Sequence, residues 1–469
     1  MAIYDEVKKL FVMFLPSVFY LSNGIPVIID NADSLTCSIS INLGIGTQNE
    51  SCKEYGITHF LEHMLGQGTY TCSSFSLLNR QLETCGAILD IRTSLDDISF
   101  SGTVLAENLH TLIEIIADEL QNSLFDNNVI ENEKKVIRNE YRRYVNANLW
   151  WLFKAEKLLG AHNVLGTPET IQSFTKQHLL DYYHKHLSSD NMLIVISGKI
   201  SNEEILKKQL EQLFSWIPKQ DIPNMSINIT PTIAHNFISD AKNQKITFAW
   251  ADTIESTIVN RKRKAAMGLF RKILQDRLIY AVREQNGLSY SIQCSTMGWA
   301  DAKLHTINSE TLPQNLEHLI TTVADVCRNI ISDTPITAKE LFSAQMVVKL
   351  QNAQIMESGV KRCALYANYF KKYKSVYNIS AEINQINHLV LTDIMMAGHN
   401  FFAAPISILT QGVTLECDVK DAWYKHLLYN ANKCPLWALF YFGWGMCNSR
   451  TELAEIGQEI IDFKHISMI

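Results

Sequence analysis

The sequence of 469 residues lacks the features that mark several large classes of protein. No stretch approaches the ~18 consecutive apolar residues that cross a bilayer, so we expect no membrane partner. The net charge of −6 gives no basic excess, which argues against a nucleic-acid partner because such proteins carry a basic face or stripe. No nucleotide-binding loop and no Ser-His-Asp signature stands out either. These absences leave an ordinary globular protein as the starting point.

The ten cysteines contain no C-x-x-C pair. A cysteine-based zinc knuckle and a thioredoxin-type redox site therefore have no support. Scattered cysteines in a chain of this size are more typical of reduced, mostly buried thiols. We therefore expect a cytoplasmic protein, because disulfides are rare in that compartment.

The length of the chain and its prolines indicate how it is divided. A chain of 469 residues is long for one hydrophobic core, so two or three domains are expected. Pro218, Pro223 and Pro231 punctuate a polar stretch that is typical of a linker. We place an N-terminal domain at residues 1–222 and a C-terminal domain at residues 228–469. Each half mixes helix and strand patterns, which predicts the α+β class, and no sequence repeat relates the halves.

Hydrophobic periodicity and turn residues predict the elements of both halves. In the first half we expect strands at Val18–Leu21, Pro26–Asp30, Thr36–Leu43, Ala87–Ile91, Ile98–Val104 and Met192–Ile196. The helices expected there are Ile57–Leu65, Phe75–Cys85, Glu107–Leu120, Asn128–Tyr144 and Asn202–Leu213. In the second half we expect strands at Lys245–Trp250 and Tyr290–Cys294, and helices at Asn260–Glu284, Leu312–Ile331 and Ala338–Phe370.

The segment His59–His63 has the residue types and spacing of a metal site. His59 and His63 are four residues apart, so on a helix their side chains leave the same face one turn apart. Two imidazoles in that geometry can bind one Zn²⁺ at about 2.0–2.1 Å. Glu62 would lie close enough to a metal-bound water to take its proton. This H-x-x-E-H pattern is the inverted metalloprotease motif, although five-residue patterns also arise by chance.

A catalytic zinc needs a third protein ligand and an open coordination position. Glu133 and Glu140 are candidates, because residues seven apart share a face of the helix expected from Asn128. Glutamates are equally common on the solvated face of a surface helix, and basic residues surround both of them. The residues alone therefore leave this choice open.

The segment Gly56–Thr69 resembles the signature of the pitrilysin family of zinc metallopeptidases, which includes insulysin and the mitochondrial processing peptidase. The resemblance implies one Zn²⁺ per chain as the cofactor and Glu140 as its third ligand. It also implies that Glu133 supports the ligands from behind and that Glu62 is the general base. The implied fold is a pair of tandem α/β-sandwich domains that form half of a clamshell chamber.

A segment of the second half, Arg283–Ser291, resembles the part of the family that carries a substrate-binding arginine and tyrosine. The resemblance implies that Arg283 and Tyr290 hold substrate and steady the oxyanion. Without the resemblance, these two residues would be an ordinary helix-end arginine and a strand tyrosine. Gly166–Glu169 and Asn191–Gly198 resemble further landmarks of the first half of the family.

The sequence departs from the family pattern at Asp90 and Ile91, where the family commonly has asparagine and alanine. In the family this strand edge pairs with the substrate backbone, so the resemblance implies that Asp90 and Ile91 bind substrate. An ionised Asp90 accepts hydrogen bonds but cannot donate them, as an asparagine can. The departure affects the expected substrate preference and leaves the expected chemistry unchanged.

These features together imply a zinc-dependent endopeptidase that hydrolyses peptides inside an enclosed dimeric chamber. Insulysin-like members carry four such domains in one chain, so two domains here imply a homodimer, or a heterodimer with a related subunit. Two alternatives are a noncatalytic scaffold subunit and a protein that sequesters peptides without turnover. Zinc content and chelator-sensitive cleavage would distinguish the enzyme from both.

Overall fold

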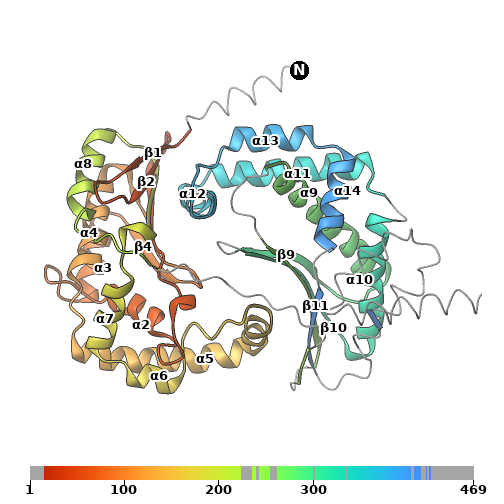
Figure 1. Ribbon diagram of the computed structural model, residues 1–469, viewed down its shortest axis with the longest axis horizontal. Coiled ribbons are helices and arrows are strands. Elements are labelled where there is room, and N and C mark those ends of the chain that lie inside the picture. The colour runs from red at the N-terminus through yellow and green to blue at the C-terminus, as the bar shows by residue number, and fades with distance from the viewer. Residues whose placement is uncertain are drawn as a thin grey trace, which may run out of the picture.

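The computed structural model describes residues 15–222, 235–238, 242–253, 261–298, 302–332, 335–402 and 406–412, together with residues 419, 422 and 423. These residues form two halves, each with its own sheet and its own hydrophobic core (Figure 1). The predicted α+β class is confirmed. Most of the predicted linker lies outside the described residues, so the domain boundary stays a prediction.

The sheet of the first half has six strands in the order β1-β2-β6-β3-β5-β4. Their bounds are β1 (Ser17–Tyr20), β2 (Pro26–Asn31), β3 (Thr36–Leu43), β4 (Ile88–Thr93), β5 (Ile98–Leu105) and β6 (Met192–Gly198). β2 and β6 are parallel, whereas all other neighbours are antiparallel. Each strand predicted in this half is confirmed, with its ends shifted by two residues or fewer.

Helices of the first half cover one face of this sheet (Figure 1). They are α2 (Ile57–Leu65), α3 (Phe75–Thr84), α4 (Leu109–Asn122), α5 (Asn127–Leu159), α6 (Pro168–Ser173), α7 (Lys176–His186) and α8 (Glu203–Phe214). Short 3-10 turns occur at η1 (Thr47–Asn49), η2 (Ala106–Asn108) and η3 (Ser189–Asn191). The predicted end of α5 at Tyr144 is wrong, because the helix runs on past a kink at Asn148. The prediction also missed α6 and α7.

The sheet of the second half has five strands in the order β7-β11-β8-β10-β9. Their bounds are β7 (His235–Ile238), β8 (Gln244–Thr253), β9 (Ile292–Gly298), β10 (Ala302–Thr311) and β11 (Ile406–Gly412). β7 and β11 are parallel, and the other neighbours are antiparallel. The predicted strand Tyr290–Cys294 begins two residues later, so Tyr290 precedes β9. The prediction missed β7, β10 and β11.

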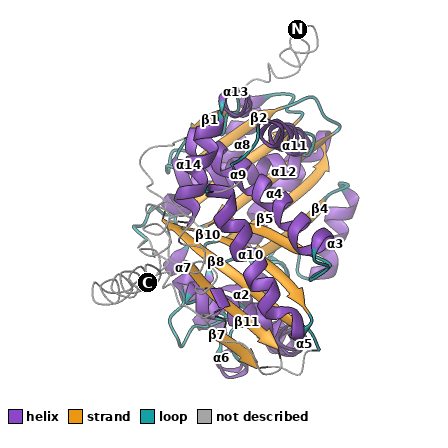
Figure 2. Ribbon diagram, turned by 90° about the vertical axis from the view of Figure 1, so that its right-hand side faces the viewer, coloured by secondary structure: helices purple, strands orange, loops and turns teal. Residues whose placement is uncertain are grey.

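The helices of the second half are α9 (Arg261–Leu278), α10 (Leu316–Ile331), α11 (Ala338–Met356), α12 (Gly359–Tyr373), α13 (Ile379–His388) and α14 (Leu391–Phe402). Figure 2 shows α9, α10 and α14 over the second sheet. α9 continues into a π-helical turn, η4 (Ile279–Gln285), and a 3-10 turn, η5 (Pro313–Asn315), precedes α10. The single helix predicted over Ala338–Phe370 is wrong, because Ser358 caps a new helix there.

The two halves have the same topology. The strand order β2-β6-β3-β5-β4 corresponds to β7-β11-β8-β10-β9, position by position along the chain. In each of these series, the strands that come first and last in chain order pair in parallel, β2 with β6 and β7 with β11. The remaining pairs are antiparallel. The structure therefore contains a duplication that the sequence does not reveal.

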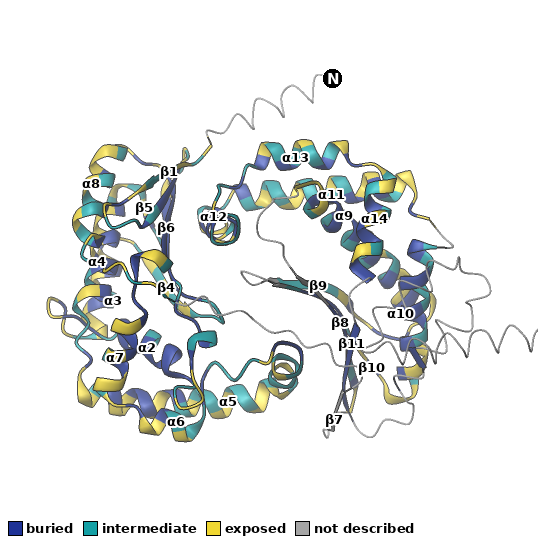
Figure 3. Ribbon diagram, in the orientation of Figure 1, coloured by how far each residue is buried: buried dark blue, intermediate teal, exposed yellow. Residues whose placement is uncertain are grey.

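Each half also sends a helix onto the sheet of the other half. α12 packs on the first sheet, on the face opposite its own helices (Figures 1 and 3). In return, Leu158 and Leu159 at the end of α5 pack against Ala249, Leu304 and Leu409 of the second sheet. Each sheet is therefore covered on one face by its own half and on the other face by a helix of the partner half.

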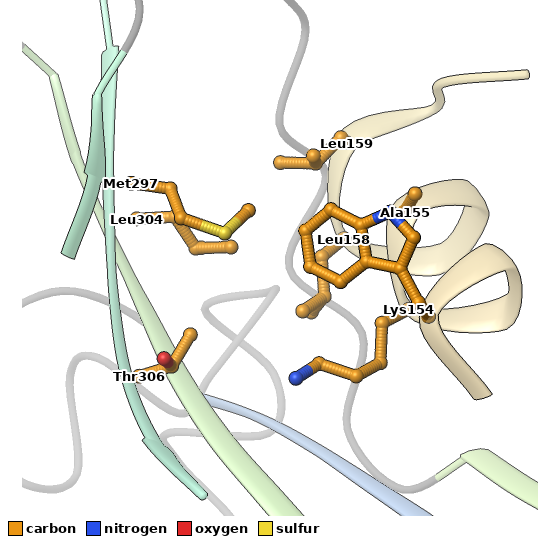
Figure 4. Close-up of a pocket in the computed structure, with 8 residues that line it drawn as sticks. Lys154, Ala155, Leu158, Leu159, Met297, Leu304 and Thr306 are labelled. Atoms are coloured by element: carbon orange, nitrogen blue, oxygen red, sulfur yellow. The ribbon is translucent and has the colours of Figure 1, made fainter. Parts of the chain in front are cut away.

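A small cavity lies where α5 meets the second sheet (Figure 4). It is lined by Trp151, Lys154, Ala155, Leu158, Leu159, Met297, Leu304 and Thr306. The Nζ atom of Lys154 donates a hydrogen bond to Oδ1 of Asn308 at 2.7 Å. Burial lowers the pKa of Lys154 to about 8. This cavity belongs to the junction between the halves, since none of its lining residues comes from the His59–His63 segment.

The seven described cysteines are free thiols, and five of them are buried. Burial raises the pKa of Cys37 to about 11 and that of Cys294 to about 12. These two thiols are therefore protonated near neutral pH and are poor nucleophiles. In the part of the chain that the structure describes, no helix is both long enough and apolar enough to cross a membrane.

Candidate active site

Helix α2 carries the His59–His63 segment and is held firmly at its N-terminus. It starts after Gly56, whose φ of 90° favours glycine, and a Cβ there would lie 2.6 Å from the carbonyl oxygen of Leu165. The carboxylate of Glu50 accepts hydrogen bonds from the backbone N–H groups of Gly56 and Thr58 at 2.8 and 2.9 Å. A carboxylate at this position satisfies the free amides of the first turn and complements the helix dipole.

A histidine that the sequence analysis missed completes this cap. His162 donates from Nε2 to Oε2 of Glu50 over 2.6 Å. Its ring stacks on Tyr55, with the ring centroids 3.7 Å apart. His162 follows the end of α5, so the contact ties α5 to the start of α2. A single histidine in a loop belongs to no motif, and no sequence signal could have identified it.

The structure brings His59, His63 and Glu140 together. Oε2 of Glu140 lies 3.8 Å from Nε2 of His59 and 3.5 Å from Nε2 of His63. Tetrahedral ligand atoms at 2.0–2.1 Å from one Zn²⁺ are about 3.4 Å apart, so these distances fit a shared zinc ion. Two imidazoles with one carboxylate are also a donor set that suits zinc. Among the described residues, His59, Glu62 and His63 also form a cluster of possible ligands within 4.8 Å of one another.

Glu133 lies behind His63 and orients it. Its Oε2 atom is 2.8 Å from Nδ1 of His63, and its Oε1 atom accepts a hydrogen bond from Gln67 at 3.1 Å. A hydrogen bond from a carboxylate to the far nitrogen of a histidine is the usual way of fixing a metal-binding imidazole. Gln67 was not identified from the sequence, although it lies within the segment that resembles the family signature.

The charges of the site favour a cation beside His63. Burial alone would lower the pKa of His63, but hydrogen bonds with Glu133 and Glu140 outweigh it and raise the pKa to about 9. Burial lowers the pKa of His59 to about 4, and the nearby His63 acts in the same direction. The carboxylates therefore stabilise positive charge at this point, whether a proton or a metal ion carries it.

Glu62 lies near the last residue of β4. Burial raises the pKa of Glu62, and the nearby polar groups of Thr93 only partly oppose this effect. A carboxylate with a raised pKa is better matched to proton transfer near neutral pH than an ordinary one. Glu62 therefore lies beside the strand that forms the edge of the first sheet.

Strand β4 is an edge strand, because its one partner among the described strands is β5. Backbone groups of an antiparallel strand point alternately toward and away from the partner strand. The N–H group of Ser94 donates to the carbonyl oxygen of Asp97, which continues the pairing of β4 with β5, so the backbone groups of Leu89 and Ile91 point away from β5. No hydrogen bond from another described residue occupies the outward groups of Leu89 and Ile91. The edge beside Glu62 is therefore open to another strand.

The two residues that the resemblance marks for substrate binding differ in their placement. Ile91 directs its backbone to the open edge, whereas the exposed carboxylate of Asp90 forms an ion pair with Arg92. Asp90 has its backbone groups in the ladder with β5, by the same alternation. Of Asp90 and Ile91, Ile91 is thus the residue that offers its backbone to an added strand.

Arg283 and Tyr290 lie together in the second half. The guanidinium carbon of Arg283 is 4.9 Å from the centre of the Tyr290 ring. Tyr290 is 83% exposed and lies two residues before the start of β9. Within the described residues, neither side chain forms a hydrogen bond or an ion pair with His59, His63 or Glu140. Within one chain, Arg283 and Tyr290 therefore contact each other but form no hydrogen bond or ion pair with the histidine cluster.

Two family models match the chain along its length. Residues 26–155 match the model described as insulinase (peptidase family M16), and residues 173–347 match the model described as peptidase M16 inactive domain. The chain belongs to peptidase family M16. The resemblance to the pitrilysin family, which is this family, is confirmed.

Relatives within the M16 family match most or about half of the chain. An uncharacterized zinc protease of Rickettsia bellii is 27% identical over 83% of this chain and 95% of its own length. The mitochondrial-processing peptidase subunit beta of Dictyostelium discoideum is 27% identical over 41% of this chain and 42% of its own length. Proteins similar to this chain are thus named as zinc or processing peptidases.

Solved structures share the fold at low sequence identity. A peptidase M16 inactive domain from Pseudomonas fluorescens has a TM-score of 0.74 and 18% identity, and covers 86% of this chain and 99% of its own. The periplasmic protease PqqL from Escherichia coli has a TM-score of 0.73 and 14% identity, over 85% of this chain but 46% of its own. The M16 fold of this chain, with its two sheets, is thereby confirmed.

Proposed function

We propose that this M16 chain is a zinc-dependent endopeptidase. One observation carries the proposal, namely the meeting of His59, His63 and Glu140 at ligand distances with Glu62 beside an open strand edge. In this proposal residues 1–222 form the zinc-binding domain and residues 228–469 the substrate-binding domain.

His59, His63 and Glu140 would hold one zinc ion, and Glu133 would orient His63 through its Nδ1 atom. Bound zinc supplies a Lewis acid for a carbonyl group and a water molecule. Glu62 takes a proton from the attacking water and returns it to the leaving amine. Burial raises the pKa of Glu62, which suits it to both transfers near neutral pH.

The open edge of β4 would bind the substrate as an added strand. The backbone groups of Leu89 and Ile91 are available for that pairing, and Thr93 ends the strand at Glu62. Main-chain pairing of this kind gives affinity without requiring a particular sequence. The peptide bond next to the paired segment would then lie against the general base. Asp90, with its carboxylate beside Arg92, would contribute charge to one face of this edge.

The decisive experiment measures zinc content and cleavage in the same preparation. We expect one zinc per chain and hydrolysis of a random peptide library that a chelator abolishes and added zinc restores. A chain that binds zinc yet cleaves nothing in the library would be a sequestering protein. A chain that binds no zinc even when metal is supplied would contradict the ligand assignment.

We further propose a homodimer in which Arg283 and Tyr290 of one chain face the zinc site of the other. Two facts support it. The pair forms no hydrogen bond or ion pair with the histidine cluster of its own chain, and the chain spans only about half of PqqL. Tyr290 and Arg283 would donate to the developing oxyanion from the side opposite the metal. Free thiols support a reducing compartment, for which we propose the cytoplasm.

Mixing two inactive variants tests the homodimer. Glu62→Gln and Tyr290→Phe should each cleave poorly alone, whereas a mixture with subunit exchange should regain activity. One of the two sites in a mixed dimer is then wholly wild type. If activity did not recover in a mixture shown by mass to contain mixed dimers, the zinc site and the Arg283–Tyr290 pair of one chain would serve the same active site.

A second candidate is a noncatalytic or peptide-sequestering subunit of a heterodimer. It is favoured by the match of residues 173–347 to a domain described as inactive, and by a relative that is one subunit of a processing peptidase. In that case activity would appear only after a related subunit is added. The purified chain alone would then bind peptides without cleaving them.

A further inference from the structure

Strand β9 is the counterpart of β4 in the second half. Both strands occupy the edge position of the shared topology, since among the described strands β9 pairs with β10 alone. An edge strand presents a row of unpaired backbone groups that other chains can bind. The duplicated fold therefore contains two edges at which a peptide could add.

One side chain occupies the outward backbone groups of β9. The Nε2 atom of Gln275, on helix α9, donates to the carbonyl oxygen of Ile292 at 2.7 Å. The Oε1 atom of Gln275 accepts from the N–H group of Cys294 at 2.5 Å. Both groups point away from β10, because residues two apart in a strand direct their backbones to the same side.

The carboxamide of Gln275 reproduces the hydrogen bonds of a neighbouring strand. In a parallel pairing, one peptide residue donates to the carbonyl of residue i and accepts from the N–H of residue i+2. A glutamine amide has one acceptor oxygen and two donor hydrogens, so it can make both bonds at once. Gln275 makes this pair of bonds with Ile292 and Cys294.

A second contact keeps α9 against the same edge. Arg271, one turn before Gln275, donates from Nη1 to the hydroxyl of Thr296, the next residue of β9 on that face. The corresponding contact of the first half differs in kind. There no side chain of α2 is hydrogen-bonded to the outward backbone groups of Leu89 and Ile91, so among the described residues these groups stay open.

We propose that Gln275 closes the β9 edge to peptides, so that one of the two equivalent edges of the fold accepts an added strand. Gln275 is thus a specificity-determining residue that confines strand addition to the half that carries the histidines. The part of this inference that concerns β4 rests on the proposed function. The part that concerns β9 rests only on the contacts of Gln275.

Peptide stoichiometry tests the inference. The probe is a dye-labelled ten-residue peptide of alternating valine and threonine, titrated against the full chain carrying Glu62→Gln to prevent turnover. Gln275→Ala should bind one more peptide per chain than the parent protein does. The matched control is Gln293→Ala, an exposed glutamine of the same strand, which should leave the stoichiometry unchanged. An unchanged stoichiometry in Gln275→Ala would overturn the proposal.

Amide hydrogen exchange supplies a readout that needs no peptide. In Gln275→Ala the amide of Cys294 should exchange at least about ten-fold faster, because its acceptor is gone, and the peptide should restore its protection. Unaltered exchange at Cys294 would contradict the assigned role. If the alanine variant does not fold, Gln275→Glu serves instead, since its carboxylate keeps the acceptor for Cys294 and loses the donor to Ile292. In Gln275→Glu the amide of Cys294 should stay protected from exchange, and the variant should bind the additional peptide weakly. If Gln275→Glu bound no additional peptide, the proposed role of the Nε2 donor would be contradicted.

Failure of this inference is distinguishable from failure of the proposed function. If β4 binds no peptide, the parent protein should bind none and Gln275→Ala should bind one. If β4 binds peptide as proposed, the parent protein should bind one peptide per chain and Gln275→Ala should bind two. The difference between the variants tests Gln275, whereas the value of the parent protein tests β4.

Discussion

The two halves share a strand order but differ in the helix that faces the edge strand. α2 is a short helix of nine residues that begins at a glycine, is capped by Glu50 and ends in the His59–His63 segment. α9 has 18 residues, many of them buried in the second core, and no possible metal cluster is found among the described residues of that half. One scaffold thus carries a cluster of possible metal ligands beside an open strand edge in one copy, and a strand edge occupied by a side chain in the other.

The halves also differ in the polar contacts where each sheet meets the helix of the other half. Where α12 meets the first sheet, the buried guanidinium of Arg362 pairs with Asp30 at 2.7 Å and donates to Ser197. Where α5 meets the second sheet, Lys154 has the neutral Asn308 as its hydrogen-bond partner. One junction thus contains a compensated charge pair, and the other contains an amine whose partners, Asn308 and the rings of Trp150 and Trp151, carry no negative charge.

The largest expected effect follows from replacing the proposed base. Glu62→Gln keeps the size of the side chain but removes the proton acceptor. We expect hydrolysis to fall about 10²–10⁴-fold while zinc and peptide still bind. Activity assays with zinc analysis check this, and Glu83→Gln, an exposed glutamate of α3, is the matched control. Normal turnover in Glu62→Gln would remove the functional distinction between the halves.

The next effect concerns the charge pair at the α12 junction. Asp30→Asn leaves Arg362 buried beside a neutral group, and removing one partner of a buried ion pair costs about 3–5 kcal/mol. Urea unfolding should show a loss of this size. The double variant Asp30→Asn with Arg362→Met should recover part of it, because no uncompensated charge then remains. Equal stabilities of the two variants would show that the charge of Arg362 is not the cause.

Much of the first half could be predicted from local sequence. β3 and α2 have the predicted bounds, because glycines mark their ends and their apolar residues repeat with a clear period. The four-residue spacing of His59 and His63 was enough to place these two side chains together, whereas the choice of Glu140 came from the resemblance to the family. For the strand, the helix and the two histidines, the deciding information lies within a few neighbouring residues or one helix.

The contacts that surround the site could not be predicted in this way. His162 reaches Glu50 across more than a hundred residues of sequence, and Gln275 recognises a backbone rather than a side chain. The parallel pairing of β7 with β11 likewise joins distant segments. These features depend on tertiary packing, and no local pattern of residue types encodes them.

Helices α4 and α10 follow equivalent strands but bury different charges. Arg328 of α10 pairs with Asp325 at 2.6 Å, whereas Glu119 of α4 is buried and its Oε2 atom has no hydrogen-bond partner. Burial raises the pKa of Glu119 to about 8, and the charge of Asp118 acts in the same direction. The folded state therefore holds this proton at a pH where the unfolded chain has released it.

This shift predicts a pH dependence of stability. Because the folded pKa lies above the unfolded value of 4.5, the stability of the wild type falls as the pH rises from about 4.5 to about 8. Glu119→Gln removes the titration, so its gain in stability should grow over that range to on the order of 3–4 kcal/mol at pH 8. Unfolding curves at pH 5 and pH 8 measure it. A gain that does not change between these pH values would contradict the assignment to Glu119.

The smallest expected effect lies at the α5 junction and has the opposite sign to that at the α12 junction. Burial lowers the pKa of Lys154 to about 8. The amine is thus protonated in both states below pH 8, and the folded state bears the cost of burying the charge. Lys154→Met removes that cost but loses the bond to Asn308, worth about 1 kcal/mol.

Asn308 keeps a partner in that variant, because its Oδ1 atom also accepts from the hydroxyl of Thr247 at 2.8 Å. We therefore expect Lys154→Met to be more stable than the wild type at pH 7, by about 1 kcal/mol after allowing for partial exposure. Because the folded pKa lies below the unfolded value of 10.5, the wild type gains stability as the pH rises from 8 to 10.5, and the advantage of the variant should disappear over that range. Urea unfolding at pH 7 and pH 10 measures both values, with Lys157→Met of the same helix as the control. If Lys154→Met were less stable than the wild type at pH 7, the buried charge of Lys154 would be compensated by its surroundings, as that of Arg362 is. The α5 and α12 junctions would then not differ in this respect.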